Sequence, residues 1–104
     1  EYLRVPLVVV MGHERCGAVK TTLEAMQSQQ RAPNAIQSLV NLIRPAFDDH
    51  PVTPDMLDFA IQANIRYSVR RLVQTPLIAS ALKQERVWVV GAYYDLYTGV
   101  VRFG

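Results

Sequence analysis

A continuous apolar segment near the start of the chain, residues 6–11, limits the folds that this sequence can adopt. Its side chains are apolar without alternation and largely β-branched, which is typical of an interior strand of a parallel sheet with both faces buried. A second segment of this kind spans residues 87–93. We therefore expect two buried strands that are parallel neighbours in one sheet.

Helical periodicity fills the sequence between these strands. The longest helix is predicted to begin at Thr53-Pro54, a capping hydroxyl followed by proline at the first helical position. Thr75-Pro76 repeats this start signal, and Pro45 is expected to break or kink the helix that precedes it. The expected helices span residues 17–26, 35–44, 54–74 and 76–84, and a turn at residues 95–99 leads to a short returning strand at residues 100–103.

The length of 104 residues, half of them hydrophobic, is that of one small domain that can bury a core. We predict a single domain of α/β class, a parallel sheet with flanking helices and a C-terminal hairpin strand. Two parallel strands cannot shield their own edges, so this sheet is expected to be incomplete.

Charge and hydropathy exclude several partners. Eleven basic and nine acidic residues leave a net charge of +2, which does not imply nucleic acid. No apolar run approaches the ~20 residues that cross a bilayer, so no membrane partner is expected. The location is unknown from this sequence, with the cytoplasm as the default. Arg66, Arg70 and Arg71 form the basic cluster of the long helix. An anion site would need them to face one groove, and we expect a solvated or subunit-facing flank instead.

The first strand runs into Gly12-His13, and the single cysteine of the chain, Cys16, follows three residues later. Gly12 would let the chain turn sharply here, and ligands of open parallel sheets bind beyond the carboxyl ends of the strands. Cys16 would fall in the first turn of the next helix, where unpaired backbone amides stabilise a thiolate, the form that binds zinc. Neutral His13 could supply a second ligand from the same turn.

Two ligands do not complete a zinc site, because structural sites have four protein ligands and catalytic sites commonly three plus water. The other histidine, His50, lies in a polar loop and is expected to be solvated. Spacing alone leaves open an inert buried cysteine beside a capping histidine. A thiol enzyme with Cys16 as nucleophile and His13 as base ranks below both, since no third residue orients the ring.

Residues 12–19, Gly-His-Glu-Arg-Cys-Gly-Ala-Val, resemble the second zinc-binding motif of the β-class carbonic anhydrases, with the expected strand before it and helix after it. Asn64 in the long helix, the Thr75-Pro76 helix start and the closing segment 89–101 resemble the C-terminal part of bacterial members. The resemblance covers essentially the whole chain. Tyr97 stands where related sequences often have a polar turn residue, and we expect it at the surface.

This resemblance implies zinc as the cofactor, His13 and Cys16 as two of its ligands, and hydration of carbon dioxide to bicarbonate by a zinc-activated water. Family members carry an upstream Cys-x-Asp-Ser-Arg motif with the remaining cysteine, and these 104 residues contain no match to it. Residues 1–4 resemble the end of the helix before the His-x-x-Cys strand. We therefore expect the C-terminal part of a β-carbonic anhydrase domain, inactive alone, with no further catalytic residue assigned.

Two other functions stay open at this point. Relatives with the same motif hydrolyse carbon disulfide or carbonyl sulfide, and fold resemblance does not settle the substrate. The incomplete sheet edge could instead serve a non-catalytic module that depends on a partner. The expected partners are carbon dioxide and bicarbonate, together with a second copy of the chain in a homo-oligomer or a chain that supplies the missing N-terminal segment.

Overall fold

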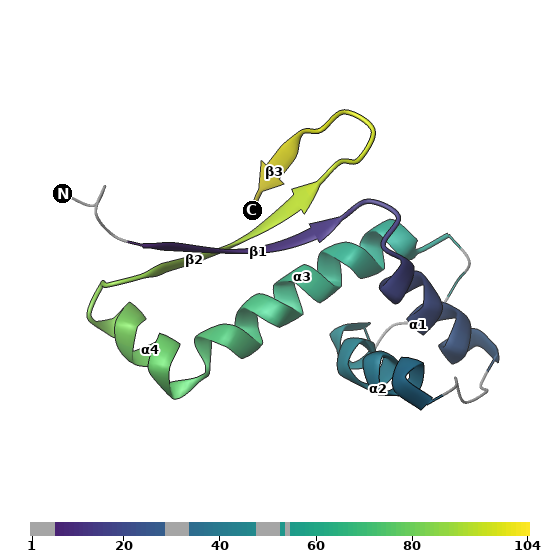
Figure 1. The fold of residues 1–104 in the computed structure, drawn as a ribbon, viewed down its shortest axis with the longest axis horizontal. Coiled ribbons are helices and arrows are strands. Elements are labelled where there is room, and N and C mark those ends of the chain that lie inside the picture. Colours follow the sequence, from purple (N-terminus) through teal and green to yellow (C-terminus); the bar gives the residue numbers. More distant parts are fainter. Residues whose placement is uncertain (1–5, 29–33, 48–52, 54) are drawn as a thin grey trace.

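The computed structural model describes residues 6–28, 34–47, 53 and 55–104. Strands and helices occur in the predicted order, so the α/β class is confirmed (Figure 1). The elements are β1 (Leu7–His13), α1 (Gly17–Ser28), α2 (Asn34–Ile43), the 3-10 helix η2 (Arg44–Phe47), α3 (Leu57–Val73), α4 (Pro76–Lys83), β2 (Trp88–Tyr94) and β3 (Val101–Phe103).

The three strands form one sheet in the order β1-β2-β3. β1 and β2 are parallel, with Leu7 opposite Trp88 at one end of the pair and His13 opposite Tyr94 at the other. β3 returns antiparallel to β2, which confirms the C-terminal hairpin. α3 runs along β1 and β2, with α1 and α2 near one end of it and α4 at the other (Figure 1). The carboxyl ends of both parallel strands therefore lie near the start of α1.

The prediction that the first strand is buried on both faces is wrong, whereas in β2 the consecutive residues Ala92 and Tyr93 are both buried. Burial alternates along β1, where Leu7 and Met11 are 56% and 53% exposed, and Trp88 of β2 is 54% exposed. The intervening residues of β1 face α3, which covers one side of the sheet in the described part of the chain. The opposite side, which we call the open face, carries the apolar side chains that point away from α3. They are Leu7, Val9, Met11 and Trp88.

Two of the three helix boundaries that were predicted from proline residues are confirmed, and the third is wrong. α2 ends at Ile43 and continues as the 3-10 helix through Pro45, and α4 begins at Pro76 after the N-cap residue Thr75. The predicted start at Thr53-Pro54 is wrong, because α3 begins at Leu57. The Thr53 hydroxyl donates to the Asp55 carboxylate at 2.8 Å and caps no helix, while Pro54 lies outside the described residues.

Close contact between α3 and the sheet depends on Ile65, which is 7% exposed. Its side chain lies over Gly12 of β1 and Gly91 of β2. A Cβ atom at Gly12 would lie 2.7 Å from Cδ1 of Ile65, and one at Gly91 would lie 2.8 Å from its Cγ2. The two glycines thus let one branched side chain pack against both parallel strands. Gly12 stays inside β1 and does not form the predicted turn, because the strand continues to His13.

The core lies between α3, α1 and the 3-10 helix. Ala60 and Ile61 of α3 are buried beside Val19, Leu23 and Phe47. No helix in the described ranges is long and apolar enough to cross a membrane.

We expect Gly12→Ala to lower the free energy of unfolding by about 1–3 kcal/mol, because the added methyl group would overlap Ile65. Urea denaturation would measure this loss. In an Ile65→Ala background the same substitution should cost much less, since the obstructing side chain is gone. Gly17→Ala is the control, because a Cβ there has no neighbour within 4 Å. An equal cost of Gly12→Ala in both backgrounds would contradict this account of the contact.

Candidate functional site

The turn between β1 and α1 holds both residues singled out in the sequence. His13 is the last residue of β1 and lies opposite Tyr94, so it stands at the carboxyl edge of the parallel pair. Cys16 directly precedes α1, and only Glu14 and Arg15 separate the two residues. Arg15 has a φ of 57°, a left-handed conformation that reverses the chain within this short connection. The fold places His13 and Cys16 on the two sides of one tight turn.

His13 is exposed, and its ring has a defined hydrogen bond. The Nδ1 atom lies 3.0 Å from the carbonyl oxygen of Glu14. A carbonyl oxygen can only accept, so in the neutral ring Nδ1 is the nitrogen that carries the proton and Nε2 is the one with the lone pair. Metal-binding histidines commonly donate their other ring N–H to a backbone carbonyl in this way. The imidazole is therefore held in the tautomer that a metal ligand needs.

Cys16 is a free thiol, half-buried and packed against the hydrophobic core. Its carbonyl oxygen accepts the amide of Lys20 at 3.0 Å, which makes Cys16 the residue that opens α1 rather than a member of its first turn. The thiol therefore lies at the N-terminal end of α1. The core contact fixes the backbone from which this sulfur projects.

Hydrogen bonds join this turn to the hairpin between β2 and β3. The Glu14 amide donates to the Tyr94 carbonyl at 2.9 Å, and the Tyr97 amide donates to Oε1 of Glu14 at 3.2 Å. Asp95 accepts from the amides of Tyr97 at 2.9 Å and Thr98 at 3.2 Å. The Thr98 amide first, and then the Tyr97 amide, lower the pKa of Asp95. Two loops that are distant in sequence therefore hold each other in place.

Tyr93 links β2 to the first turn of α3. Its hydroxyl donates to Oδ1 of Asp58 at 2.7 Å, and the guanidinium of Arg102 lies 4.9 Å from the centre of its ring. Burial, together with the hydrogen bond and the negative charge of Asp58, raises the pKa of Tyr93 from 10.0 to about 12. The neutral phenol thus stabilises the end of the sheet that carries His13.

Sequence reasoning missed the parts played by Glu14, Asp58 and Tyr93. Glu14 and Asp58 have partners that are 83 and 35 positions away, so no local pattern could identify them. The expected surface position of Tyr97 is confirmed, since this side chain is 87% exposed. His50 lies outside the described residues. Within those residues, no group of three or more His, Cys, Asp or Glu side chains is placed to hold a metal ion.

Comparison with known proteins identifies relatives over nearly the whole chain. The family model described as "Carbonic anhydrase" matches residues 1–101. A carbonic anhydrase of Mycolicibacterium smegmatis is 41% identical over 101 residues, which are 95% of this chain and 49% of the relative. A carbonic anhydrase of Synechococcus elongatus is 28% identical over 104 residues, 95% of this chain and 38% of the relative. The chain spans half or less of the length of these curated relatives.

Solved structures share the fold. The β-carbonic anhydrase CafA of Aspergillus fumigatus superimposes with a TM-score of 0.80 at 21% identity, over 98% of this chain and 50% of that one. The Coccomyxa β-carbonic anhydrase in complex with acetazolamide gives a TM-score of 0.79 at 22% identity, over 99% of this chain and 48% of that one. At these identities the likeness concerns the fold alone.

We expect the free energy of unfolding to fall by roughly 2 kcal/mol between pH 10 and pH 12 through Tyr93, because its pKa rises from 10.0 to about 12 on folding. The unfolded chain loses this proton first, so the stabilisation is complete below pH 10 and is lost as the pH approaches 12. Tyr93→Phe should lack this loss, and urea denaturation across the range would measure the difference. Tyr94→Phe is the matched control. Identical pH dependence in wild type and Tyr93→Phe would contradict the assignment.

Proposed function

This chain belongs to the β-carbonic anhydrase family, and from that membership we propose that it carries part of a zinc site for the reversible hydration of carbon dioxide to bicarbonate. His13 and Cys16 are the proposed zinc ligands. The family match over residues 1–101 supports the reaction, and the relatives named above are carbonic anhydrases rather than hydrolases of carbon disulfide or carbonyl sulfide. We also propose that these 104 residues form the C-terminal part of the family's domain.

The donor set of the turn supports the choice of metal. Zinc prefers thiolate sulfur and imidazole nitrogen, and this turn offers one of each. The hydrogen bond from Nδ1 of His13 to the Glu14 carbonyl leaves Nε2 available, and this is the observation that carries the proposal. When bound, zinc would polarise water so that it attacks carbon dioxide near neutral pH.

The residues around the ligands would keep the turn rigid while the reaction proceeds. The Glu14 carboxylate accepts a hydrogen bond from the Tyr97 amide of the hairpin, and the Glu14 carbonyl oxygen accepts one from the His13 ring. Cys16 is fixed from the other side by its contact with the core. Because the backbone positions on both sides of the turn are set before any metal arrives, little ordering is left for the binding step.

The site needs a further ligand. Catalytic zinc sites commonly use three protein ligands, and the sequence contains a single cysteine and two histidines. We propose that the third ligand comes from a segment with the family's Cys-x-Asp-Ser-Arg motif, in the same protein or on a partner chain, and that the protein forms a homo-oligomer. The open face supports a covering partner, since Leu7, Met11 and Trp88 are each more than half exposed there.

His13→Ala and Cys16→Ser should each weaken zinc binding by more than about tenfold, because even changes in the residues that orient a ligand cost 10–100-fold. Competition titration with a chromophoric chelator would measure the affinity. His50→Ala should leave the affinity within about twofold and serves as the matched control. Equal zinc affinity in wild type and Cys16→Ser would contradict the assignment of the ligands.

The chain alone should hydrate carbon dioxide slowly or not at all, because two ligands hold zinc weakly and the family's aspartate–arginine pair is absent from these 104 residues. Stopped-flow measurement with a pH indicator would test this expectation. Addition of a peptide with the Cys-x-Asp-Ser-Arg segment should raise both zinc content and the rate. The proposal of a divided site would be contradicted if the isolated chain hydrated carbon dioxide and His13→Ala abolished that activity.

A further inference from the structure

Glu14 directs all three of its polar groups toward the neighbours of the proposed zinc ligands. Its amide donates to the Tyr94 carbonyl at 2.9 Å, at the carboxyl end of the parallel pair. Its carbonyl oxygen lies 3.0 Å from Nδ1 of His13, and its carboxylate oxygen Oε1 accepts the Tyr97 amide at 3.2 Å. One residue therefore connects the ring of a proposed ligand to the hairpin between β2 and β3.

The backbone beside Glu14 is in a conformation that needs support. Arg15 has a φ of 57°, which is unfavourable for a residue with a Cβ atom, and such residues persist where the surrounding structure over-determines them. Two attachments do so here. Glu14 is bound to the hairpin, Cys16 packs against the core, and Arg15 alone joins them. The left-handed conformation of Arg15 thus depends on the attachment of Glu14.

Release of Glu14 from the hairpin would let Arg15 return to a negative φ. This change rotates the peptide between Glu14 and Arg15, and with it the carbonyl oxygen that faces Nδ1 of His13. A neutral imidazole without this acceptor can carry its proton on either nitrogen. The contact of the Glu14 carboxylate with the hairpin therefore supports the one tautomer that leaves Nε2 free for a metal.

The hairpin is a firm point of attachment because its own hydrogen bonds order it. Oδ1 of Asp95 accepts the amides of Tyr97 at 2.9 Å and of Thr98 at 3.2 Å, and the Asp95 amide donates to the Val100 carbonyl at 2.9 Å. The Tyr97 amide is thus shared by two carboxylates, those of Asp95 and Glu14. The Tyr97 side chain is 87% exposed, so the contact with Glu14 uses the backbone of Tyr97 and not its ring.

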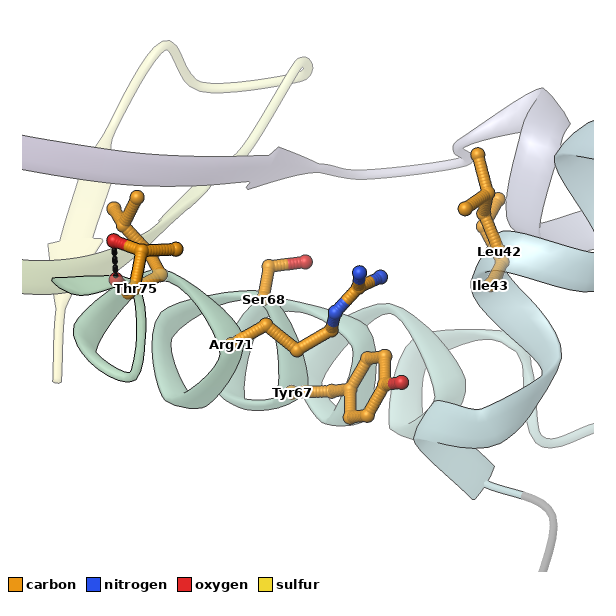
Figure 2. Close-up of a pocket in the computed structure, with 7 residues that line it drawn as sticks. Leu42, Ile43, Tyr67, Ser68, Arg71 and Thr75 are labelled. Atoms are coloured by element: carbon orange, nitrogen blue, oxygen red, sulfur yellow. Dashed lines mark hydrogen bonds between the residues drawn. The ribbon is translucent and has the colours of Figure 1, made fainter.

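Pairing with a cation does not explain the position of the Glu14 carboxylate. It forms no ion pair with a residue in the described ranges, and its partner is a neutral amide. The arginines of α3 lie elsewhere and do not face one groove. Arg66 and Arg70 line the hollow between α3 and the hairpin, whereas Arg71 lines a separate hollow of about 370 Å³ beside Tyr67, across from α2 (Figure 2). The hydrogen bond to the hairpin is therefore the contact that places Glu14.

We propose that Glu14 is a positioning residue for the zinc ligand His13. Its carboxylate, bound to a hairpin amide 83 positions away in the sequence, keeps the turn in the conformation in which the Glu14 carbonyl accepts the Nδ1 proton. This role rests on the proposed function, because it assigns Glu14 a part in zinc binding although Glu14 is not a proposed ligand. Residues that orient a metal ligand commonly change the affinity for the metal by about 10–100-fold.

Two substitutions at Glu14 separate position from charge, with zinc affinity measured by competition with a chromophoric chelator. Glu14→Ala removes the acceptor and should weaken zinc binding about tenfold, the lower end of the usual range. Glu14→Gln loses the charge but keeps a side-chain carbonyl oxygen that can accept the Tyr97 amide, so its affinity should stay within about threefold of wild type. Tyr97→Ala is the matched control and should change the affinity by less than about twofold, because the contact uses the backbone of Tyr97.

The His13 ring gives a second measurement, which is made on the metal-free protein. Nitrogen-15 NMR of labelled histidine at about pH 9, where histidine side chains are neutral, identifies the ring nitrogen that carries the proton. A His50→Ala background leaves one histidine signal. We expect the proton on Nδ1 in this background and with Glu14→Gln added, and a proton distributed over both nitrogens with Glu14→Ala added.

Equal losses of zinc affinity in Glu14→Ala and Glu14→Gln would overturn the proposal, because they would assign the effect to charge. An Nδ1 proton that stays in place in Glu14→Ala would overturn it as well. Failure of the proposed zinc site is a different result, since His13→Ala and Cys16→Ser would then leave the zinc affinity unchanged. In that case the NMR measurement, which contains no zinc, still decides whether Glu14 positions the His13 ring.

Discussion

The packing of Ile65 over Gly12 and Gly91 is the contact on which the rest of this structure depends. It holds α3 against the two parallel strands at once, at a distance that any larger side chain at either glycine would increase. Gly12 directly precedes His13, which lies opposite Tyr94 at the carboxyl ends of β1 and β2. The same side chain lines the hollow between α3 and the hairpin of β2 and β3.

The turn with the proposed zinc ligands is rigid because it is tied to distant elements. Glu14 connects it to the hairpin, Cys16 connects it to the core, and Tyr93 connects the neighbouring strand to Asp58 of α3. The His13 ring adds its own hydrogen bond to a backbone carbonyl. Such second-layer contacts set the orientation of a metal ligand before the metal binds. If the turn binds zinc as proposed, it needs further ligands to complete the site.

Local patterns in the sequence predicted the elements and their order, because runs of β-branched residues and helical spacings report on the neighbours of each residue. They also predicted the His13–Cys16 turn, and the family resemblance predicted the exposed position of Tyr97. They failed where the cause is tertiary. The apolar run of β1 predicted two buried faces, whereas α3 covers one of them. Thr53 has the residue type of a helix cap, but its hydroxyl binds Asp55. The contacts of Glu14 and Asp58 join residues that no local window contains.

The proposed zinc site requires that one imidazole and one thiolate from this turn bind the same zinc ion. X-ray absorption at the zinc edge of the zinc-loaded protein tests it most directly. We expect a sulfur scatterer at about 2.3 Å together with an imidazole pattern at about 2.0–2.1 Å. In Cys16→Ser the sulfur contribution should disappear while the imidazole pattern remains. A spectrum with oxygen and nitrogen scatterers alone, or a sulfur contribution that persists in Cys16→Ser, would contradict the claim.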